Sequence, residues 1–170
     1  MTKKLDKLLK ICATSGIHIE RTKLPTNMKA FYYSDQDIDP VISIDYSVDN
    51  QNEVACVLAE EVGHYYTSSG NLLTDSDLHK SIVRKQENIA KRWAFKYMVS
   101  LSDLINAHNA SCQTLNEVAE FLNITEEFLR DAAQAYENIY GSYILHQGFK
   151  IYFNPLWVIK EEDCYEDQPT

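Results

Sequence analysis

Several features that would assign the chain to a particular class of protein are missing from its sequence. The four cysteines include no CxxC pair, so the sequence predicts neither a zinc ribbon nor a dithiol redox motif. No apolar run reaches the roughly 18 to 20 residues that span a bilayer. Lysines interrupt the N-terminal segment MTKKLDKLLKICATSG, which does not resemble a signal peptide. We therefore expect a cytoplasmic protein with reduced thiols.

Positive charge is also scarce. The 170 residues include 16 Lys and Arg against 25 Asp and Glu, which gives a formal net charge of −9. An acidic chain has no electrostatic reason to bind a phosphate backbone, so this balance argues against direct nucleic-acid binding. The 45% of hydrophobic residues and 24% of charged residues are nevertheless typical of a globular protein.

The first half of the sequence alternates between helix and strand patterns. Leu and Lys recur at helical spacing over residues 3–15, and the segments IHIER, MKAFYY and VISID are typical of short strands. A second helix is expected over 51–67, where Asn50 and Glu53 have the spacing of a capping box. A longer helix is expected to follow over about 78–100.

The last third of the sequence is mainly helical. Thr114 and Glu117 form another capping box, and a segment with helix-turn-helix spacing is expected over 111–141. Two strands are then expected on either side of a turn at Gln147 and Gly148.

The sequence contains no repeat, low-complexity linker or clear domain boundary. A length of 170 residues suffices for one ordinary domain with a hydrophobic core. We predict a single α+β domain over residues 1–160, which includes the helix-turn-helix-like segment 111–141, and an acidic tail over 161–170.

The helix expected over 51–67 contains the stretch EEVGH, which has the spacing of the zinc-protease motif His-Glu-x-x-His with Glu60 in the first position. Glu60 and His64 are four residues apart, so they share one edge of the helix. Glu61 falls within the apolar face, where a carboxylate is costly unless it has a partner. Gly63 costs about 1 kcal/mol inside a helix, which indicates that another backbone approaches it closely.

The helix expected over 81–99 places a second carboxylate on an apolar face. Apolar residues cover one half of this helix, and five Lys and Arg residues cover the other. Glu87 lies on the apolar side, between the directions of Ala94 and Met98. If both helices bury a carboxylate in this way, a shared cation would explain both.

A metal ion gives each of these residues a role. Side chains at i and i+4 of a helix can bind one ion, so Glu60 and His64 would be ligands, Glu87 the third ligand and a water the fourth. The metal would lower the pKa of that water toward about 7. Glu61 would accept the proton of the water and pass it to the leaving amine.

Each of these residues also has an ordinary structural interpretation. Glu60 could be a solvated residue on the helix surface. His64 could be a hydrogen-bonded histidine at the edge of the helix. Glu87 could pair with Arg84 or Lys91, an interaction worth roughly a few tenths of a kcal/mol. The residue pattern leaves the metal centre and these interpretations open.

The segments NEVACVLAEEVGHYYTS and KQENIAKRWAFKYMVS together resemble the ImmA/IrrE-type metallopeptidases of phages and mobile elements. The spacing from His64 to Glu87 and the run ENIAKRWA are similar to the third-ligand helix of that family. The segments TLNEVAEFLNITEEFLRDAAQAYENIYG and GFKIYFNPLWVIK resemble the C-terminal part of members from Gram-positive phages. The resemblance covers about residues 3–160.

This resemblance implies a zincin-like minimal metallopeptidase fold, with a small antiparallel sheet packed on the metal-site helix and a helical C-terminal part. It implies a cytosolic zinc-dependent endopeptidase that cleaves a helix-turn-helix repressor, as an anti-repressor that derepresses a prophage or mobile element. By position, His64 and Glu87 match zinc ligands and Glu61 matches the catalytic base. Glu60 occupies the place of the first histidine of the family.

A carboxylate at position 60 changes the chemistry of the ligand set. One imidazole and two carboxylates suit harder ions, so Mn²⁺ or another divalent ion is an alternative to Zn²⁺. The nearby segment TDSDLHK offers Asp75, Asp77 and His79 as further ligands. The sequence therefore predicts a metal centre without fixing the metal.

Two other functions are compatible with the sequence. A pseudo-peptidase would keep the fold and regulate the repressor by binding it without cleavage. A DNA-binding regulator would use the helix-turn-helix spacing within 111–141. The second helix of that segment carries four carboxylates and one cation: Glu126, Glu127, Asp131, Glu137 and Arg130. Because such a face repels phosphate, we expect a protein partner and no direct contact with nucleic acid or membrane.

Overall fold

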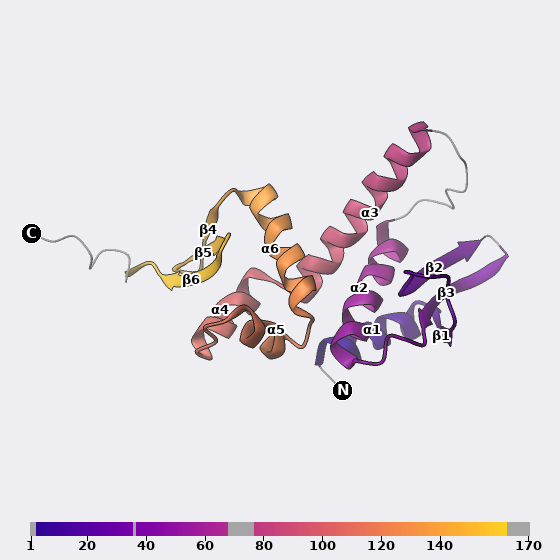
Figure 1. Ribbon diagram of the computed structural model, residues 1–170, viewed down its shortest axis with the longest axis horizontal. Helices are drawn as coiled ribbons and strands as arrows, with labels where there is room; N and C mark the ends of the chain where they lie inside the picture. The colour runs from indigo at the N-terminus through magenta and orange to yellow at the C-terminus, as the bar shows by residue number, and fades with distance from the viewer. Residues whose placement is uncertain (1–2, 36, 68–76, 163–170) are drawn as a thin grey trace, which may run out of the picture. The chain divides into compact units, whose positions relative to one another are not determined.

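The computed structural model of the chain describes residues 3–35, 37–67 and 77–162. Contacts within the chain divide it into two compact units, Met1–Met98 and Val99–Thr170 (Figure 1). A division into two compact units does not show whether the units unfold separately or together. The single domain predicted from the sequence therefore stays a prediction.

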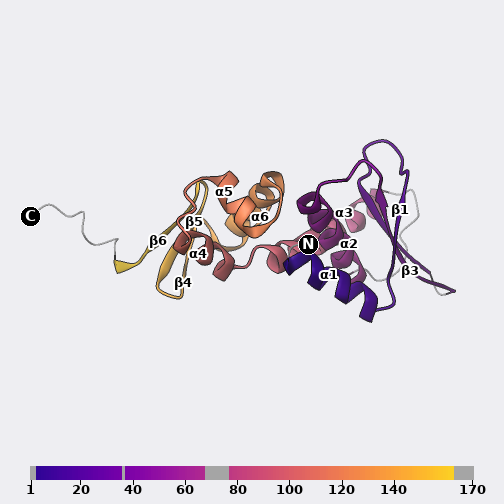
Figure 2. The same cartoon turned by 90° about the horizontal axis from the view of Figure 1, so that it is seen from below.

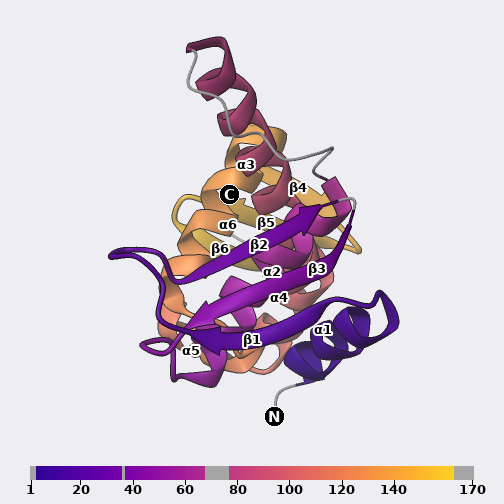
Figure 3. The ribbon, with the colours of Figure 1, turned by 90° about the vertical axis from the view of Figure 1, so that its right-hand side faces the viewer.

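The N-terminal unit consists of a three-stranded sheet and three helices. Its elements are α1 (Lys3–Thr14), β1 (His18–Thr22), β2 (Ala30–Asp35), β3 (Ile38–Asp45), α2 (Gln51–Thr67) and α3 (Asp77–Met98). Figure 2 shows the helices on one side of the sheet, and α2 packs against both β2 and β3. The strand order is β1-β3-β2, which leaves β2 at an edge of the sheet (Figure 3).

The predicted α+β class is confirmed, as is a small sheet packed on the helix that carries EEVGH. The sheet was expected to be antiparallel, but it is mixed. β2 pairs with β3 in antiparallel fashion, whereas β1 pairs with β3 in parallel. The strand patterns did not indicate this parallel pairing, because the sequence of a strand does not show the direction in which its neighbour runs.

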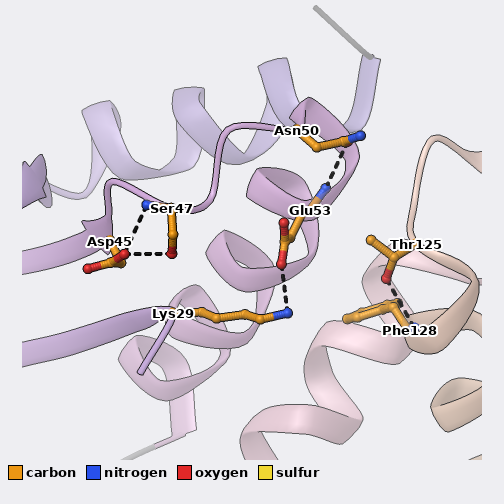
Figure 4. A network of polar contacts seen from close by, with 7 residues as sticks. All are labelled: Lys29, Asp45, Ser47, Asn50, Glu53, Thr125 and Phe128. Atoms are coloured by element: carbon orange, nitrogen blue, oxygen red, sulfur yellow. Dashed lines mark hydrogen bonds and ion pairs between the residues drawn. The ribbon is translucent and has the colours of Figure 1, made fainter. Parts of the chain in front are cut away.

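The start of α2 is fixed by the predicted Asn50 cap. The side-chain oxygen of Asn50 accepts hydrogen bonds from the N–H groups of Asn52, at 2.8 Å, and Glu53, at 3.4 Å (Figure 4). The carboxylate of Glu53 pairs with Lys29 Nζ at 2.6 Å, and Lys29 immediately precedes β2. These contacts link the first turn of the helix to the sheet.

The packing of α2 against α3 depends on Gly63. A Cβ atom on Gly63 would lie 2.5 Å from the backbone oxygen of Ala90, closer than a carbon and an oxygen can approach. Ala90 and Ala94 are fully buried, so small residues on α3 face the glycine on α2. The close approach predicted from Gly63 is therefore confirmed, and it determines how near the side chains beside Gly63 come to α3.

Aromatic rings extend along the same pair of helices. Tyr65 packs edge-on against Tyr32 of β2, and Tyr66 stacks on Trp93 with ring centroids 5.1 Å apart. Trp93 in turn stacks on Tyr97, also at 5.1 Å. On a helical wheel, this row and the side chains of His64 and Glu87 lie on opposite sides of the contact between Gly63 and Ala90. The α2–α3 contact is thus bordered by aromatic rings on one side and by the candidate ligands on the other.

The C-terminal unit contains three helices and a second sheet. Its elements are α4 (Leu101–Asn109), α5 (Leu115–Leu122), α6 (Glu126–Tyr140), β4 (Tyr143–His146), β5 (Phe149–Phe153) and β6 (Leu156–Lys160). The strands form an antiparallel sheet in the order β4-β5-β6, which packs on α4 and α6. Leu129, Ile151 and Phe153 belong to the core of this unit, where the Tyr136 hydroxyl donates to the backbone oxygen of Val99.

Local signals in the sequence account for much of this unit. The capping box of Thr114 and Glu117 is present, and Asn123 adopts the left-handed conformation that ends α5. The sequence patterns did not predict α4, although Ser100 and Asp103 form a capping box at its start. They also did not predict β6, because the two expected strands already form a complete hairpin.

Within the residues that the structure describes, no helix is both long enough and apolar enough to cross a membrane.

Replacing Gly63 with Ala tests the contact between α2 and α3. Helix propensity alone would stabilise this variant by about 1 kcal/mol. The added methyl group meets backbone that cannot rotate away, so we expect the free energy of unfolding to fall by about 1–3 kcal/mol. Urea denaturation measures the change, with Asn88→Ala on the exposed face of α3 as the control. A Gly63→Ala variant as stable as the wild type would contradict the close approach.

Candidate metal centre

α2 presents the three residues of its motif at the boundary of the core. Leu58, Ala59 and Val62 are fully buried, whereas Glu60, Glu61 and His64 are partly buried. A helix of 3.6 residues per turn brings Glu60 and His64 to one edge and turns Glu61 toward the sheet. The chain therefore holds these polar groups beside the apolar face of the helix and not within its centre.

Glu61 lies against the edge strand of the sheet. The backbone N–H of Tyr32 in β2 donates a hydrogen bond to its carboxylate. Burial raises the pKa of Glu61 to about 7, and the negative charges of Glu60 and Glu87 raise it further, whereas His64 and the Tyr32 N–H lower it. A carboxyl group with this pKa exists in both protonation states at neutral pH, so it can accept a proton and release it again.

His64 and Glu87 form the contact between α2 and α3 at this site. His64 Nε2 lies 3.4 Å from Glu87 Oε1. The hydrogen bond with Glu87 raises the pKa of His64, burial opposes this, and the charges of Glu61, Glu87 and Glu60 add to the rise. The same hydrogen bond lowers the pKa of Glu87. Three carboxylates thus act on a single imidazole.

The expectation that Glu87 is buried in an apolar face is wrong. Its side chain is 50% exposed. Ile82 and Ile89, on the apolar side of the same helix, are also exposed, and Ala90 is the first buried residue among residues 81–98. The helical wheel identified the correct side of the helix, but it could not show that none of residues 81–89 is buried.

The structure brings together two of the three predicted ligands, His64 and Glu87. Glu60 lies one turn before His64 on the same edge of α2, and its charge acts on both Glu61 and His64. Among the residues that the structure describes, no three His, Cys, Asp or Glu side chains gather closely enough to hold a metal ion. The ligand set of Glu60, His64 and Glu87 therefore stays a prediction.

The additional ligands considered in the sequence cannot be placed. Asp75 lies outside the described residues, and the side chains of Asp77 and His79 are likewise outside the described part of α3. Their contribution to a metal site stays a prediction.

The chemistry of the site fits a divalent cation. The raised pKa of His64 reflects an excess of negative charge around a group that is itself a common metal ligand. One imidazole and neighbouring carboxylates are donors that Zn²⁺ and Mn²⁺ both accept. His64 and Glu87 would hold such a cation, which would supply Lewis acidity at this site.

An α+β unit with a metallopeptidase-type motif on a helix beside an edge strand defines the class of this protein. The family model described as the IrrE N-terminal-like domain, a peptidase family, matches residues 12–133. The chain belongs to this family and has a metallopeptidase-type function. Neither a curated protein nor a solved structure matches the chain significantly.

The pH dependence of the contact between His64 and Glu87 can be tested in the metal-free protein. A raised His64 pKa means that the folded chain holds this proton more tightly than the unfolded chain. The ionised pair therefore stabilises the fold at pH values between the lowered pKa of Glu87 and the raised pKa of His64. This contribution is lost as the pH rises through the raised pKa of His64. We expect Glu87→Gln to lower the pKa of His64.

NMR titration of the His64 ring measures this pKa in the wild type and in the Glu87→Gln variant. The Glu120→Gln variant, on the exposed side of α5, is the control and should leave the His64 titration unchanged. An unchanged His64 titration in Glu87→Gln would mean that the two side chains do not interact in solution.

Proposed function

We propose that the chain is a metal-dependent endopeptidase with Glu60, His64 and Glu87 as metal ligands and Glu61 as the general base. The metal is Zn²⁺, with Mn²⁺ or another divalent ion as the alternative. The observation that carries this proposal is the position of the Glu61 carboxylate, between the edge strand β2 and the pair of His64 and Glu87. The family match over residues 12–133 includes all four residues.

Each side chain has a part in peptide hydrolysis. A divalent cation bound at this position supplies Lewis acidity for the attack of water on a carbonyl group. Glu61 takes the proton from the attacking water and later gives it to the leaving amine. The Tyr32 N–H holds the carboxylate in place through both transfers, because a positioned base avoids reorganisation during the reaction.

The edge strand suggests how a substrate would lie. β2 pairs with β3 on one side only, and an extended peptide can add to an exposed strand edge through backbone hydrogen bonds. A peptide bound there would pass beside Glu61, whose carboxylate is fixed by β2 itself. This arrangement favours cleavage within an extended segment of a protein over removal of a terminal residue.

We propose that the substrate is a helix-turn-helix transcriptional repressor of a prophage or mobile element. The chain would bind this repressor in the cytoplasm. Support comes from the resemblance of α2 and α3 to ImmA/IrrE-type metallopeptidases and from membership of the IrrE N-terminal-like family. Cleavage of the repressor would relieve repression. In this proposal the chain contacts the protein partner and neither nucleic acid nor membrane.

A second candidate is a pseudo-peptidase that regulates the repressor by binding it. Two observations favour it: Glu87 is half exposed, and no group of three donors forms within the described residues. A ligand that must reorient to bind metal gives up conformational freedom, which lowers affinity. Metal binding therefore discriminates between the two candidates.

The proposed ligands can be tested by calorimetric titration with Zn²⁺ and Mn²⁺. We expect the wild type to bind a single ion. Glu60→Gln, His64→Ala and Glu87→Gln should each weaken binding by at least about tenfold, since each removes a ligand. Glu120→Gln, on the exposed side of α5, is the matched control. Absence of binding to the wild type would favour the pseudo-peptidase.

The proposed base can be tested separately from the ligands. Glu61→Gln should keep metal affinity within a few-fold of the wild type and lower the cleavage rate by about 10²–10⁴-fold. The measurement is mass spectrometry of a proteome-derived peptide library incubated with metal-loaded protein. Equal cleavage by wild type and Glu61→Gln would remove Glu61 from the mechanism.

A further inference from the structure

The sheet of the C-terminal unit has an outer face that no described element covers. Residues that pair directly across strands point to the same side of a sheet. The register pairs Tyr143 with Tyr152 and Tyr152 with Trp157, and it pairs Leu145 with Lys150 and Lys150 with Ile159. We call these residues the aromatic face: Tyr143, Leu145, Lys150, Tyr152, Trp157 and Ile159.

The aromatic face is strongly apolar for a solvent-facing surface. Leu145 is 54% exposed, Trp157 51% and Tyr143 45%. The opposite face of the sheet buries Ile151 and Phe153, so the sheet is already anchored to its core without the outer side chains. Large exposed apolar groups gathered on one face are typical of a protein–protein contact.

The rings on this face are already ordered. The rings of Tyr143 and Tyr152 have centroids 5.6 Å apart. Lys150 Nζ lies over both, at 4.2 Å from the Tyr143 centroid and 4.9 Å from that of Tyr152. The position above these two rings is occupied by the chain's own Lys150, so within this cross-strand row the exposed ring of Trp157 is the one that can accept a cation of a partner.

A cavity lies between β6 and the helices α4 and α5, and Trp157 is the residue of the aromatic face that lines it. Its volume is about 320 Å³, and Trp157, Leu104, His108 and Val118 are among its lining residues. This volume is at the lower end of the range for small-ligand pockets. The cavity can accept an anchoring side chain of a partner that lies on the sheet.

Charge identifies the kind of partner. Residues 99–170 contain 12 Asp and Glu and only 3 Lys and Arg, whereas residues 1–98 contain 13 of each kind. The entire net charge of −9 therefore belongs to the unit that carries the aromatic face. That unit repels nucleic acid, an anionic membrane and a second copy of itself, and it attracts a basic protein surface.

We propose that the aromatic face docks a basic, partly apolar segment of a protein partner. This inference rests on the proposed function, because DNA-binding surfaces of repressors are basic. The acidic unit would bind such a surface in place of DNA and so hold the substrate on the same chain as the peptidase motif. The face lies beyond residues 12–133, so the family match does not account for it.

Fluorescence anisotropy with full-length Glu61→Gln protein, free of metal, tests this docking without cleavage. The probe is a short labelled amphipathic peptide with Leu on one face and Lys and Arg on the other. A second peptide carries Glu in place of each Lys and Arg. We expect only the cationic peptide to bind, with an affinity that falls as salt concentration rises.

Variants locate the binding surface. Trp157→Ala and Leu145→Ser should each weaken binding of the cationic peptide by about tenfold or more, the effect expected at an interface hot spot. Tyr46→Ala is the matched control, because Tyr46 is a similarly exposed aromatic residue of the other unit. Circular dichroism checks that each variant is folded. If Trp157→Ala unfolds, the Leu145→Ser variant, at the edge of the sheet, still tests the binding surface.

The outcomes separate docking from catalysis. Weakened docking in Trp157→Ala and Leu145→Ser, with metal binding and short-peptide cleavage retained when Glu61 is present, supports the proposal. No binding of the cationic peptide, equal binding of the acidic peptide, or unchanged affinity in both variants overturns it. Docking without metal binding or cleavage would overturn the proposed peptidase and leave the docking surface in place.

Discussion

The contact between Gly63 and Ala90 determines the geometry of the candidate site. It lets the backbones of α2 and α3 approach so closely that His64 of one helix and Glu87 of the other come within 3.4 Å. A larger residue at either position would separate the helices and part these donors. The small residues in the helix interface therefore position the candidate ligands His64 and Glu87 as well as allowing the helices to pack.

Local charge gives this site its character. Glu60, Glu61 and Glu87 surround one imidazole, and the result is a His64 that holds its proton tightly and a Glu61 that is half protonated near neutral pH. Both effects arise from negative charge confined beside an apolar core, which a divalent cation would neutralise. The same excess of carboxylates that makes the metal-free site costly makes it suitable for a metal.

Much of the fold follows from local patterns in the sequence. Asn50 and Thr114 each cap the helix that their position predicts, and Gly63 marks the close approach of α3. The juxtaposition of His64 and Glu87 was expected from the metal-site hypothesis and from the resemblance to ImmA/IrrE-type metallopeptidases. The features that the sequence did not reveal depend on tertiary context: the parallel pairing of β1, the exposure of Glu87, and the third C-terminal strand β6.

The central claim is that a metal ion joins His64 to carboxylates of α2 and α3. X-ray absorption spectroscopy of the chain loaded with Zn²⁺ tests it most directly, because the method identifies the atoms bound to the metal. The account predicts oxygen ligands together with one imidazole, whose scattering disappears in the His64→Ala variant. Sulfur ligands, or a spectrum that is unchanged in His64→Ala, would contradict it.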